Sequence, residues 1–214
     1  MKKIYLILAS AAMLLAIDAN AQISAGLGYN LMTTTSSIAS DSEDEALNGF
    51  FVEATYDFNF LNREWGRLYL QPGLRYTFAA EAESEEYSGI KAKVSLTEHY
   101  IDVPVNVKYS YDIMQGQIKA YAFAGPVFSI GLASTLKASL DDESASTDMY
   151  DDNDYGRFDL KLGLGAGVTF LEKYNVKIGY NIGLLNRYTG NQSDSDTKLK
   201  MNTGVFYVGI GYNF

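Results

Sequence analysis

The sequence predicts an all-β protein, an eight-stranded antiparallel transmembrane β-barrel with long extracellular loops and short periplasmic turns. Three observations support this fold class. Apolar and polar residues alternate with a period of two in eight segments, short and long polar spacers alternate between the segments, and the chain opens with the layout of an export signal. The composition agrees, because Tyr (17) and Gly (19) are abundant, Pro (3) is scarce, and the mean hydropathy of -0.09 is near neutral.

The N-terminal residues have three parts. Two lysines precede an apolar run from Ile4 to Ile17, and Ala19-Asn20-Ala21 supplies the small-x-small pattern that a signal peptidase cuts. The apolar run is shorter than the ~20 residues that span a bilayer as a helix. We therefore expect a signal peptide, residues 1–21, followed by an outer membrane β-barrel domain, residues 22–214. An ordinary buried N-terminal helix is the alternative.

The alternation is clearest in the last segment, Thr203–Phe214, where one face is apolar and the other is small or polar. Seven earlier segments show the same pattern: Ile23–Leu31, Phe50–Phe60, Leu68–Phe78, Ile101–Tyr109, Gln117–Leu132, Phe158–Phe170 and Val176–Leu184. The apolar face of each segment is predicted to meet lipid, and the other face is predicted to fill a closed lumen.

Two segments depart from this simple pattern. In Gln117–Leu132 the aromatic residues compete with a run of alanines at even positions, and we expect Tyr121 and Phe123 to face outward. In the fourth segment the apolar positions change from even to odd numbers. A β-bulge near Thr97–Tyr100 would account for this change of phase.

The spacers are alternately short and long. The short spacers are 62–66, 112–116 and 171–175, and the long, polar spacers are 34–48, 79–89, 133–157 and 186–200. With an even number of strands, both termini lie on the side of the short turns. We therefore expect an integral outer membrane protein with periplasmic termini and acidic extracellular loops. Aromatic residues near both strand ends predict two interfacial girdles.

The lumen of such a barrel is predicted to be filled. Eight strands leave an interior just wide enough for side chains, so we expect no open pore. Hairpins centred on their short turns place Glu53 opposite Arg75 and Asp159 opposite Arg187 on the inner face. Such pairs each stabilise a sheet by ~0.2–1 kcal/mol. A soluble β-sandwich would also alternate, but glycines and charges of both signs on the polar face favour a lumen.

The charge and composition exclude several functions. Without the signal peptide, 15 basic and 25 acidic residues remain, and such a chain repels nucleic acid. Cysteine is absent, which excludes lipoprotein attachment, disulfides and thiol chemistry. Asp151, Asp152 and Asp154 offer oxygen ligands but lack the spacing of an EF-hand, so they are weak metal candidates only. We expect no cofactor.

The sequence also offers no catalytic residues. His99 is the only histidine and is expected near the outer interface. A catalytic histidine needs a nucleophile and an orienting carboxylate, and no spacing here selects them. The glycines at 163, 165 and 167 lie within a strand and do not fit a nucleotide-binding loop.

Several motifs are similar to one family. The stretch His99–Tyr109 resembles the Tyr-x-(Asp/Glu)-x-Pro-x-x-x-Lys-Tyr signature of PorT-like outer membrane β-barrels of Bacteroidota. Ala124-Gly125-Pro126 and Phe158–Val168 resemble two further strands of that family, although Lys161 stands where a glycine is common. The resemblance implies the barrel fold and the outer membrane location, and it brings no catalytic residues. The founding member is tied to protein secretion.

The C-terminal residues Tyr212 and Phe214 are similar to the aromatic tail that the barrel-insertion machinery recognises. We expect a non-enzymatic barrel that serves as a surface interaction or envelope-stabilising module, because long charged loops commonly carry binding. The alternative is an accessory component of a protein secretion system, followed by a small-solute channel or a lipid-modifying enzyme. The expected partners are outer membrane lipid and lipopolysaccharide, the insertion machinery, and extracellular or secretion-system proteins.

Overall fold

A computed structural model describes residues 22–38, 41–87, 90–114, 117–140, 143–152, 155–190 and 199–214. Within these ranges it contains nine strands and one short helix: β1 (Gln22–Ile38), β2 (Asp41–Arg63), β3 (Gly66–Tyr87), β4 (Ile90–Met114), β5 (Ile118–Leu140), β6 (Glu143–Asp148), α2 (Met149–Asp152), β7 (Phe158–Phe170), β8 (Tyr174–Gly183) and β9 (Lys200–Asn213). No helix of the described ranges has the length and hydropathy needed to span a bilayer. The predicted signal peptide lies outside the described residues.

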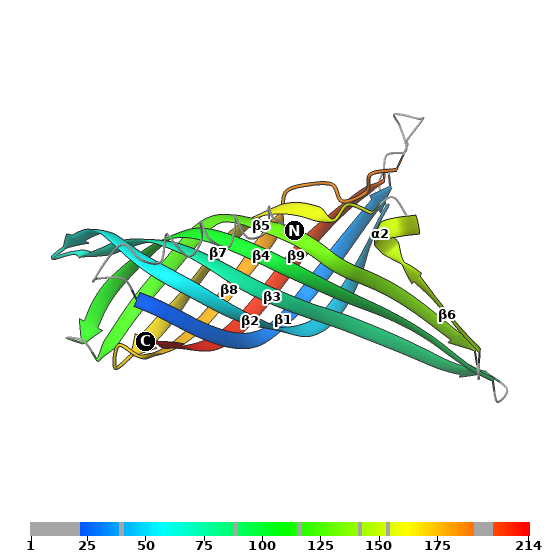
Figure 1. Cartoon of the computed structure of the whole chain (residues 1–214), viewed down its shortest axis with the longest axis horizontal. Coiled ribbons are helices and arrows are strands. Elements are labelled where there is room, and N and C mark those ends of the chain that lie inside the picture. The colour runs from blue at the N-terminus through cyan, green and yellow to red at the C-terminus, as the bar shows by residue number, and fades with distance from the viewer. Residues whose placement is uncertain are drawn as a thin grey trace, which may run out of the picture.

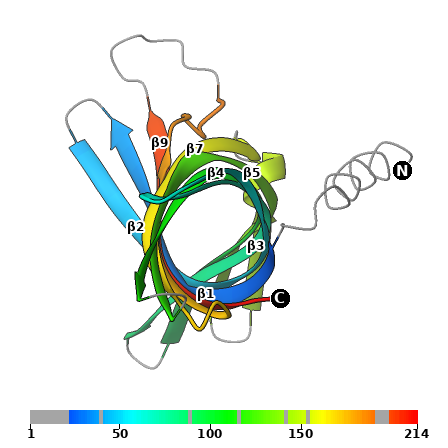
Figure 2. The same ribbon diagram turned by 90° about the vertical axis from the view of Figure 1, so that its left-hand side faces the viewer.

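Eight of the strands close into one antiparallel ring, as predicted. Each strand pairs with the next along the chain from β1 to β5, β5 pairs with β7, and β9 closes the ring onto β1 (Figure 1). Figure 2 shows the ring from one end. β6 lies outside the ring and pairs with the end of β5. Closure lets main-chain N–H and C=O groups bond to neighbouring strands, which a lipid environment requires.

The two faces of the wall differ as the alternation predicts. On β8 and β9, Ile178, Val208 and Ile210 are exposed on the outside of the barrel. On the same two strands, Asn181 and Tyr207 are buried inside it. The outer face is therefore an apolar belt and the inner face is polar and filled, which is the arrangement of a membrane-spanning barrel.

The outward orientation predicted for Tyr121 and Phe123 is wrong. Both rings point into the lumen and are 7% exposed, whereas the alanines beside them lie outside. Their partners in the β5–β7 register are Gly167 and Gly165. A Cβ atom on either glycine would lie 2.4 Å from the facing ring. The glycines supply the space that two inward rings need, and this space cannot be read from β5 alone.

The β-bulge predicted near Thr97–Tyr100 lies at that level of the barrel, but its extra residue is in β5 and not in β4. The β3–β4 register runs without a shift along its whole length. The irregularity lies in the neighbouring strand β5, where Leu132 is an extra residue opposite His99 and Tyr100. Because β4 keeps one phase, Leu96 turns inward onto a buried apolar cluster formed by Met32, Leu47, Ala79, Tyr100 and Val205.

One end of the barrel carries short turns, as predicted. β2 and β3 join just beyond the Arg63–Gly66 pair, and β7 and β8 join beyond Phe170–Tyr174. The chain terminus also lies here, where the N–H of Phe214 bonds to the carbonyl of Ile23. This is called the short-turn end below, and the opposite end is called the long-hairpin end.

The long-hairpin end differs from the prediction. In the spacers 34–48 and 79–89, predicted as loops, the described residues are strands: β1 and β2 stay paired up to Ile38 and Asp41, and β3 and β4 up to Tyr87 and Ile90. β5 continues into β6 in the same way. A hairpin that stands in water needs no apolar face, so the alternation that marks a half-buried strand is missing from its sequence.

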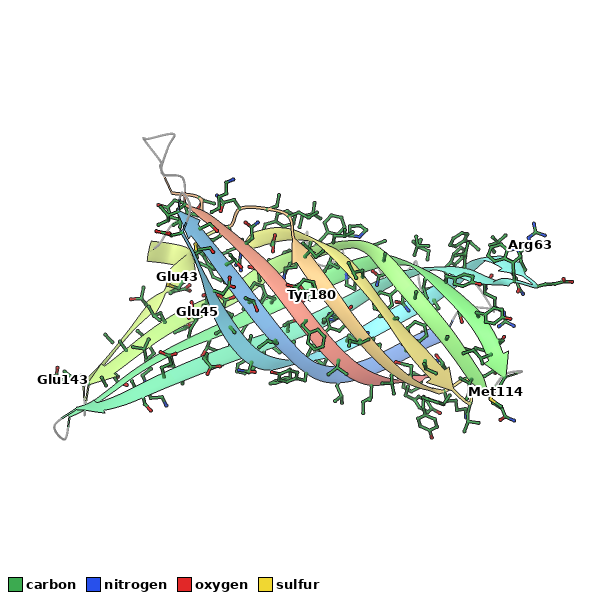
Figure 3. All side chains as sticks on the ribbon, turned by 180° about the vertical axis from the view of Figure 1, so that it is seen from behind. Glu43, Glu45, Arg63, Met114, Glu143 and Tyr180 are labelled. Atoms are coloured by element: carbon green, nitrogen blue, oxygen red, sulfur yellow. The ribbon has the colours of Figure 1, made fainter. Side chains whose placement is uncertain are left out.

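The long-hairpin end is split into two branches. β2 pairs with β3 only up to Asn48 and Ala80; farther out, β2 stays with β1 and β3 stays with β4. The branches point apart, with β1, β2 and β9 in one and β3 to β6 in the other (Figure 1). Figure 3 shows Glu43 and Glu45 on the first branch and Glu143 at the tip of the second. The facing segments 41–47 and 81–87 are called the fork.

Candidate functional site: a filled charged lumen below an open fork

The described part of the lumen is lined by five acidic and five basic side chains. They are Glu53, Asp57, Glu98, Asp102, Asp159, Arg75, Lys108, Lys161, Lys177 and Arg187. The formal charges of this set cancel. Because a buried charge without a partner is costly, the contacts among these side chains decide how stable the filled barrel is.

Glu53 and Arg75 lie directly opposite each other in the β2–β3 register. Arg75 donates two hydrogen bonds to Oε2 of Glu53, at 2.8 and 3.0 Å. Lys177 reaches across the lumen from β8 and binds the other carboxylate oxygen. The guanidinium carbon of Arg75 lies 4.5 Å from the centre of the Phe51 ring and 4.1 Å from that of Tyr207. One carboxylate therefore holds two cations, and two aromatic rings flank the arginine.

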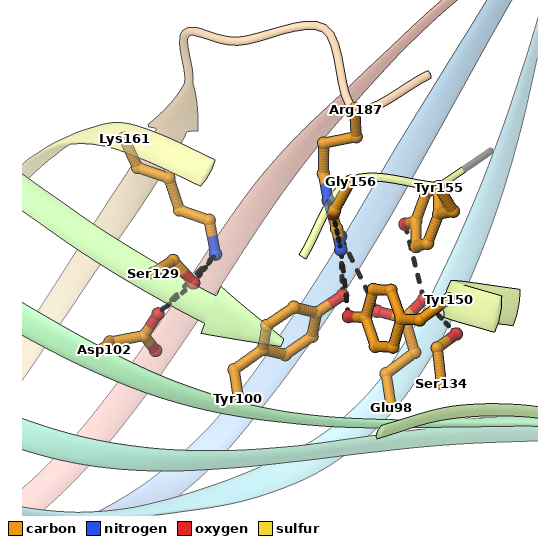
Figure 4. A network of polar contacts seen from close by, with 10 residues as sticks. All are labelled: Glu98, Tyr100, Asp102, Ser129, Ser134, Tyr150, Tyr155, Gly156, Lys161 and Arg187. Atoms are coloured by element: carbon orange, nitrogen blue, oxygen red, sulfur yellow. Dashed lines mark hydrogen bonds and ion pairs between the residues drawn. The ribbon is translucent and has the colours of Figure 1, made fainter. Parts of the chain in front are cut away.

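Two further carboxylates are also bound by cations. Lys108 donates a hydrogen bond of 2.6 Å to Asp57. Asp102 accepts a hydrogen bond of 2.5 Å from Ser129, and Nζ of Lys161 lies 3.7 Å from the same Asp102 oxygen (Figure 4). The two lysine contacts connect strands that are not neighbours, β4 with β2 and β7 with β4, so they fix the shape of the ring from inside.

Arg187 ties the segment after β6 to the barrel wall (Figure 4). Its guanidinium donates to the hydroxyl oxygens of Tyr100 at 2.6 Å and Tyr150 at 3.0 Å, and to the carbonyl of Gly156 at 3.1 and 3.3 Å. Glu98 forms an ion pair with it at 3.9 Å. Burial raises the pKa of the Tyr150 hydroxyl to about 12, so this group stays neutral at ordinary pH.

The predicted pair of Asp159 and Arg187 does not form. The β7–β8 turn has three residues, 171–173, so the register is centred on Glu172, one residue earlier than predicted. Continued outward, this register brings Leu185 level with Asp159. The Asp159 side chain is 1% exposed, and Arg187 forms its ion pair with Glu98 instead.

Sequence reasoning missed the partners that meet across the lumen. Lys177 with Glu53, and Lys161 with Asp102, join residues far apart in the chain. Each of these residues occupies an inward position of its strand, which is the one signal that the sequence holds. Which inward charges meet depends on how the strands are staggered around the ring, and the hairpin turns do not determine that.

The filled lumen leaves little free space. One cavity beside Arg75 and Asp102 has a volume of ≈ 10 Å³, and another beside Glu53 and Lys177 has a volume of ≈ 20 Å³. A cavity of this size holds about one water molecule. The described interior therefore has the packed form expected for an eight-stranded barrel.

A much larger cleft of ≈ 400 Å³ opens at the fork. Its lining combines acidic side chains of β2 and β3 with apolar ones of β4, including Glu43, Glu45, Glu81, Glu83, Val94 and Leu96. Asn48 lies where the fork begins and donates a hydrogen bond of 2.8 Å to Glu81. This cleft carries more acidic side chains than the hollow of ≈ 420 Å³ that lies between the ends of β4, β5 and β6.

His99 lies on the outer face of the barrel. Its Nδ1 atom is 2.7 Å from the hydroxyl oxygen of Tyr76, and its ring packs edge-on against Phe78 with centroids 5.2 Å apart. In the described part of the chain, no serine or carboxylate forms a hydrogen bond with it. This environment is that of an interfacial aromatic cluster.

The remaining candidate residues are separate from this lumen. At the short-turn end, the rings of Tyr212 and Phe214 pack edge-on with centroids 5.1 Å apart. The side chains of Asp151 and Asp152, and all of Asp154, lie outside the described residues. Where side chains are described, no three acidic, histidine or cysteine side chains gather in a metal-binding group.

A closed ring of eight strands with an apolar belt and a charged, filled lumen defines an integral β-barrel protein of the outer membrane. The family model described as outer membrane protein beta-barrel domain matches residues 16–189, and the chain belongs to this family.

Three solved barrels are similar to this chain over most of its length. Ail, the attachment invasion locus protein of Yersinia pestis, solved with the heparin analogue sucrose octasulfate, is 16% identical over 91% of this chain and 99% of its own, with a TM-score of 0.42. The outer membrane enzyme PagL is 12% identical over 85% and 97%, with a TM-score of 0.45. Neisserial surface protein A is 14% identical over 89% and 97%, with a TM-score of 0.39. No curated protein sequence matches the chain.

Proposed function

We propose that this protein is a surface interaction or envelope-stabilising module of the outer membrane. The observation that carries the proposal is the branch made of β3 to β6, which extends beyond the ring as hydrogen-bonded strands. A sheet held away from the lipid by a closed barrel is a firm platform for binding. In this proposal the long-hairpin end is extracellular and the termini are periplasmic, the usual orientation of such barrels.

Trimming this branch tests the proposal. Removing residues 84–93 and 138–145 and closing each hairpin with Asn-Gly shortens the sheet. It leaves Glu98, Tyr150 and Arg187 in place, so the barrel is expected to fold. Cells carrying the trimmed protein should lose surface binding or become sensitive to detergent, with unchanged amounts of folded barrel in the membrane. Normal binding and normal envelope resistance would contradict the proposal.

The filled lumen supports a function other than solute passage. Cavities of ≈ 10 and ≈ 20 Å³ beside the central charge cluster leave no room for a hydrated solute in the described interior. The purified barrel should therefore show no stable conductance in planar bilayers. Steady single-channel currents would favour a small-solute channel instead.

We also propose that the barrel is not an enzyme and uses no cofactor. His99 contacts Tyr76 and Phe78 rather than a nucleophile and a carboxylate in the described structure. Replacing His99 with alanine should leave the composition of the envelope lipids unchanged. A changed acylation pattern of lipopolysaccharide in that variant would favour a lipid-modifying enzyme.

A second candidate is an accessory role in protein secretion. It rests on the resemblance of His99–Tyr109 to PorT-like barrels of Bacteroidota. The structure supplies a feature that suits this role, since Asp102 and Lys108 of that motif face the lumen, where they form ion pairs with Lys161 and Asp57. Loss of the gene should then block export of other proteins, and normal export would exclude this candidate.

The proposed assembly partners are the barrel-insertion machinery, which would contact the short-turn end, and outer membrane lipid, which would contact the apolar belt. Phe214 is 76% exposed at the short-turn end, where the barrel-insertion machinery would reach it. Removing Phe214 should lower the yield of inserted barrel while leaving the unfolded chain in the periplasm. The apolar belt would be covered by outer membrane lipid, with lipopolysaccharide around the outer girdle.

A further inference from the structure

The fork presents two strand edges to each other. Beyond the pair of Asn48 and Ala80, segment 41–47 of β2 pairs with β1, and segment 81–87 of β3 pairs with β4. Among the described strands, none pairs with the facing edges of these two segments. The N–H and C=O groups along such an edge are a template for a further strand. Each edge of the fork therefore offers hydrogen-bonding groups to one more strand.

Like charges explain why the fork does not close on itself. If the β2–β3 register continued beyond Asn48 and Ala80, Glu45 would face Glu83. Like charges directly opposite each other destabilise a pair of strands. The acidic residues on both edges therefore oppose pairing between β2 and β3, and they leave the two edges accessible to another chain.

The side chains around the fork indicate what kind of strand fits. Five acidic residues line the cleft of ≈ 400 Å³: Glu43, Asp44, Glu45, Glu81 and Glu83. The four glutamates share the odd-numbered, inward phase of Glu53 on β2 and Arg75 on β3. Val94 and Leu96 on β4 add an apolar part to the same lining. The cleft thus combines backbone edges, negative charge and an apolar surface.

We propose that the fork binds an extended segment of another protein that carries Lys or Arg at every second position. This proposal rests on the proposed surface interaction function and names its partner. The segment adds as a strand to the free edge of one branch, and the acidic side chains of the other branch face it across the cleft. Its inward basic groups meet the four glutamates, and their methylene stems cover Val94 and Leu96.

Other occupants fit the fork less well. A second copy of this chain would bring its own acidic edges, and like charges would oppose pairing between two forks. A metal ion needs several oxygen ligands close together, and the described side chains form no group of three such ligands. Only a basic strand uses the backbone edges and the acidic lining together.

A defined peptide tests the proposal directly. The probe is a fluorescent peptide of about eight residues that repeats Lys-Thr, titrated against the full mature barrel in nanodiscs. Its matched control has the same sequence with N-methylated backbone amides at alternate residues, which keeps the charge but removes main-chain donors. We expect the affinity of the control peptide to be lower by at least about tenfold. Added salt should weaken binding of the unmodified peptide.

Charge-reversal variants of the barrel test whether the peptide binds at the fork or elsewhere on the acidic surface. The variant Glu45→Lys/Glu83→Lys keeps like charges facing each other at the mouth, so the fork is expected to stay open, and the two lysines offset the charges of Glu43 and Glu81. It should lose about tenfold in affinity for the Lys-Thr peptide. The matched control, Glu64→Lys/Glu143→Lys, changes the net charge equally at two exposed sites outside the cleft and should bind the Lys-Thr peptide as before.

The outcomes are distinct. Equal binding of the N-methylated peptide would overturn strand addition, and equal loss in both lysine variants would overturn the fork as the site. If trimming residues 84–93 and 138–145 abolishes surface binding while the Glu45→Lys/Glu83→Lys variant retains it, this inference fails and the proposed function stands. If neither change affects surface binding, both fail. Gel migration of the folded barrel verifies that every variant is inserted.

Discussion

The strands β2 and β3 pair with each other in the ring but separate in the fork. In the ring, Glu53 faces Arg75, and the strands are joined by hydrogen bonds and an ion pair. Farther out, the same register would place Glu45 opposite Glu83, and the strands part. The comparison teaches that facing charges decide how far this pair of strands stays joined.

The surroundings of the two regions reinforce this difference. Within the ring, a separated pair of strands would expose main-chain groups to hydrocarbon, where each group without a partner costs several kcal/mol. At the fork, water can bind the same groups. The ring must therefore close whatever its side chains are, whereas the fork is free to open under a modest repulsion.

The largest effect is expected from breaking the central charge cluster of the ring. Glu53→Ala leaves Arg75 and Lys177 buried without the carboxylate that they share. Removing one partner of a buried ion pair lowers the free energy of unfolding by about 3–5 kcal/mol, and we expect a loss in that range here. Urea unfolding of the inserted barrel measures the loss. The matched change in the fork, Glu45→Ala, removes an exposed carboxylate and should stay within about 0.5 kcal/mol. Similar losses for both would refute the contrast.

A charge on the lipid-facing side of the ring should have the next largest effect. Val208 is exposed on the outer face of β9, within the apolar belt. Val208→Arg should destabilise the barrel by about 2–4 kcal/mol, the cost of arginine near the bilayer midplane. Ala46→Arg, on the exposed part of β2 beyond the ring, should be nearly neutral. Equal tolerance of the two substitutions in a folding titration would show that the belt does not face lipid.

Crowding inside the ring predicts a somewhat smaller loss. A Cβ atom at Gly165 would lie 2.4 Å from the ring of Phe123 and 2.5 Å from the carbonyl oxygen of Ile178. Gly165→Ala should therefore cost about 1–3 kcal/mol, the usual range for overpacking. At Gly156, outside the ring, the nearest atom to a Cβ would be 3.2 Å away, so Gly156→Ala is the milder control. If Gly165→Ala and Gly156→Ala lower the free energy of unfolding equally, the lumen is packed less tightly around Gly165 than these distances indicate.

The ring can be predicted from the sequence because its wall separates two different solvents. Every second residue must suit lipid and the next must suit a filled polar interior, so eight alternating segments appear. The predicted pairing of Glu53 with Arg75 is present, but the turn alone does not fix it. The register at Arg63 and Gly66 would place Glu53 opposite Tyr76, and the register shift between Asn59 and Leu61 brings Arg75 opposite Glu53.

Other features depend on contacts that no single hairpin determines. Lys177 meets Glu53 across 124 positions of sequence, and the inward position of Phe123 depends on the glycine opposite it. Asp159 was placed opposite the wrong residue because one residue of turn length shifts a whole register. The fork could not be predicted for a different reason. Its strands extend beyond the membrane-spanning ring into water, so neither of their faces has to be apolar.

The smallest effect is expected at the short-turn end, where an exposed ion pair lies outside both regions. Nζ of Lys119 is 2.8 Å from Oε1 of Glu172, and this hydrogen bond holds the pKa of the Glu172 carboxyl below its ordinary value. The pair therefore stabilises the fold above the unfolded pKa, and this contribution is lost as the pH falls through the folded pKa. For an exposed pair it amounts to about 0.2–1 kcal/mol. Glu172→Gln should lower the unfolding free energy near neutral pH and leave it unchanged well below the folded pKa. The same loss at both pH values would mean that Glu172 acts through packing rather than charge.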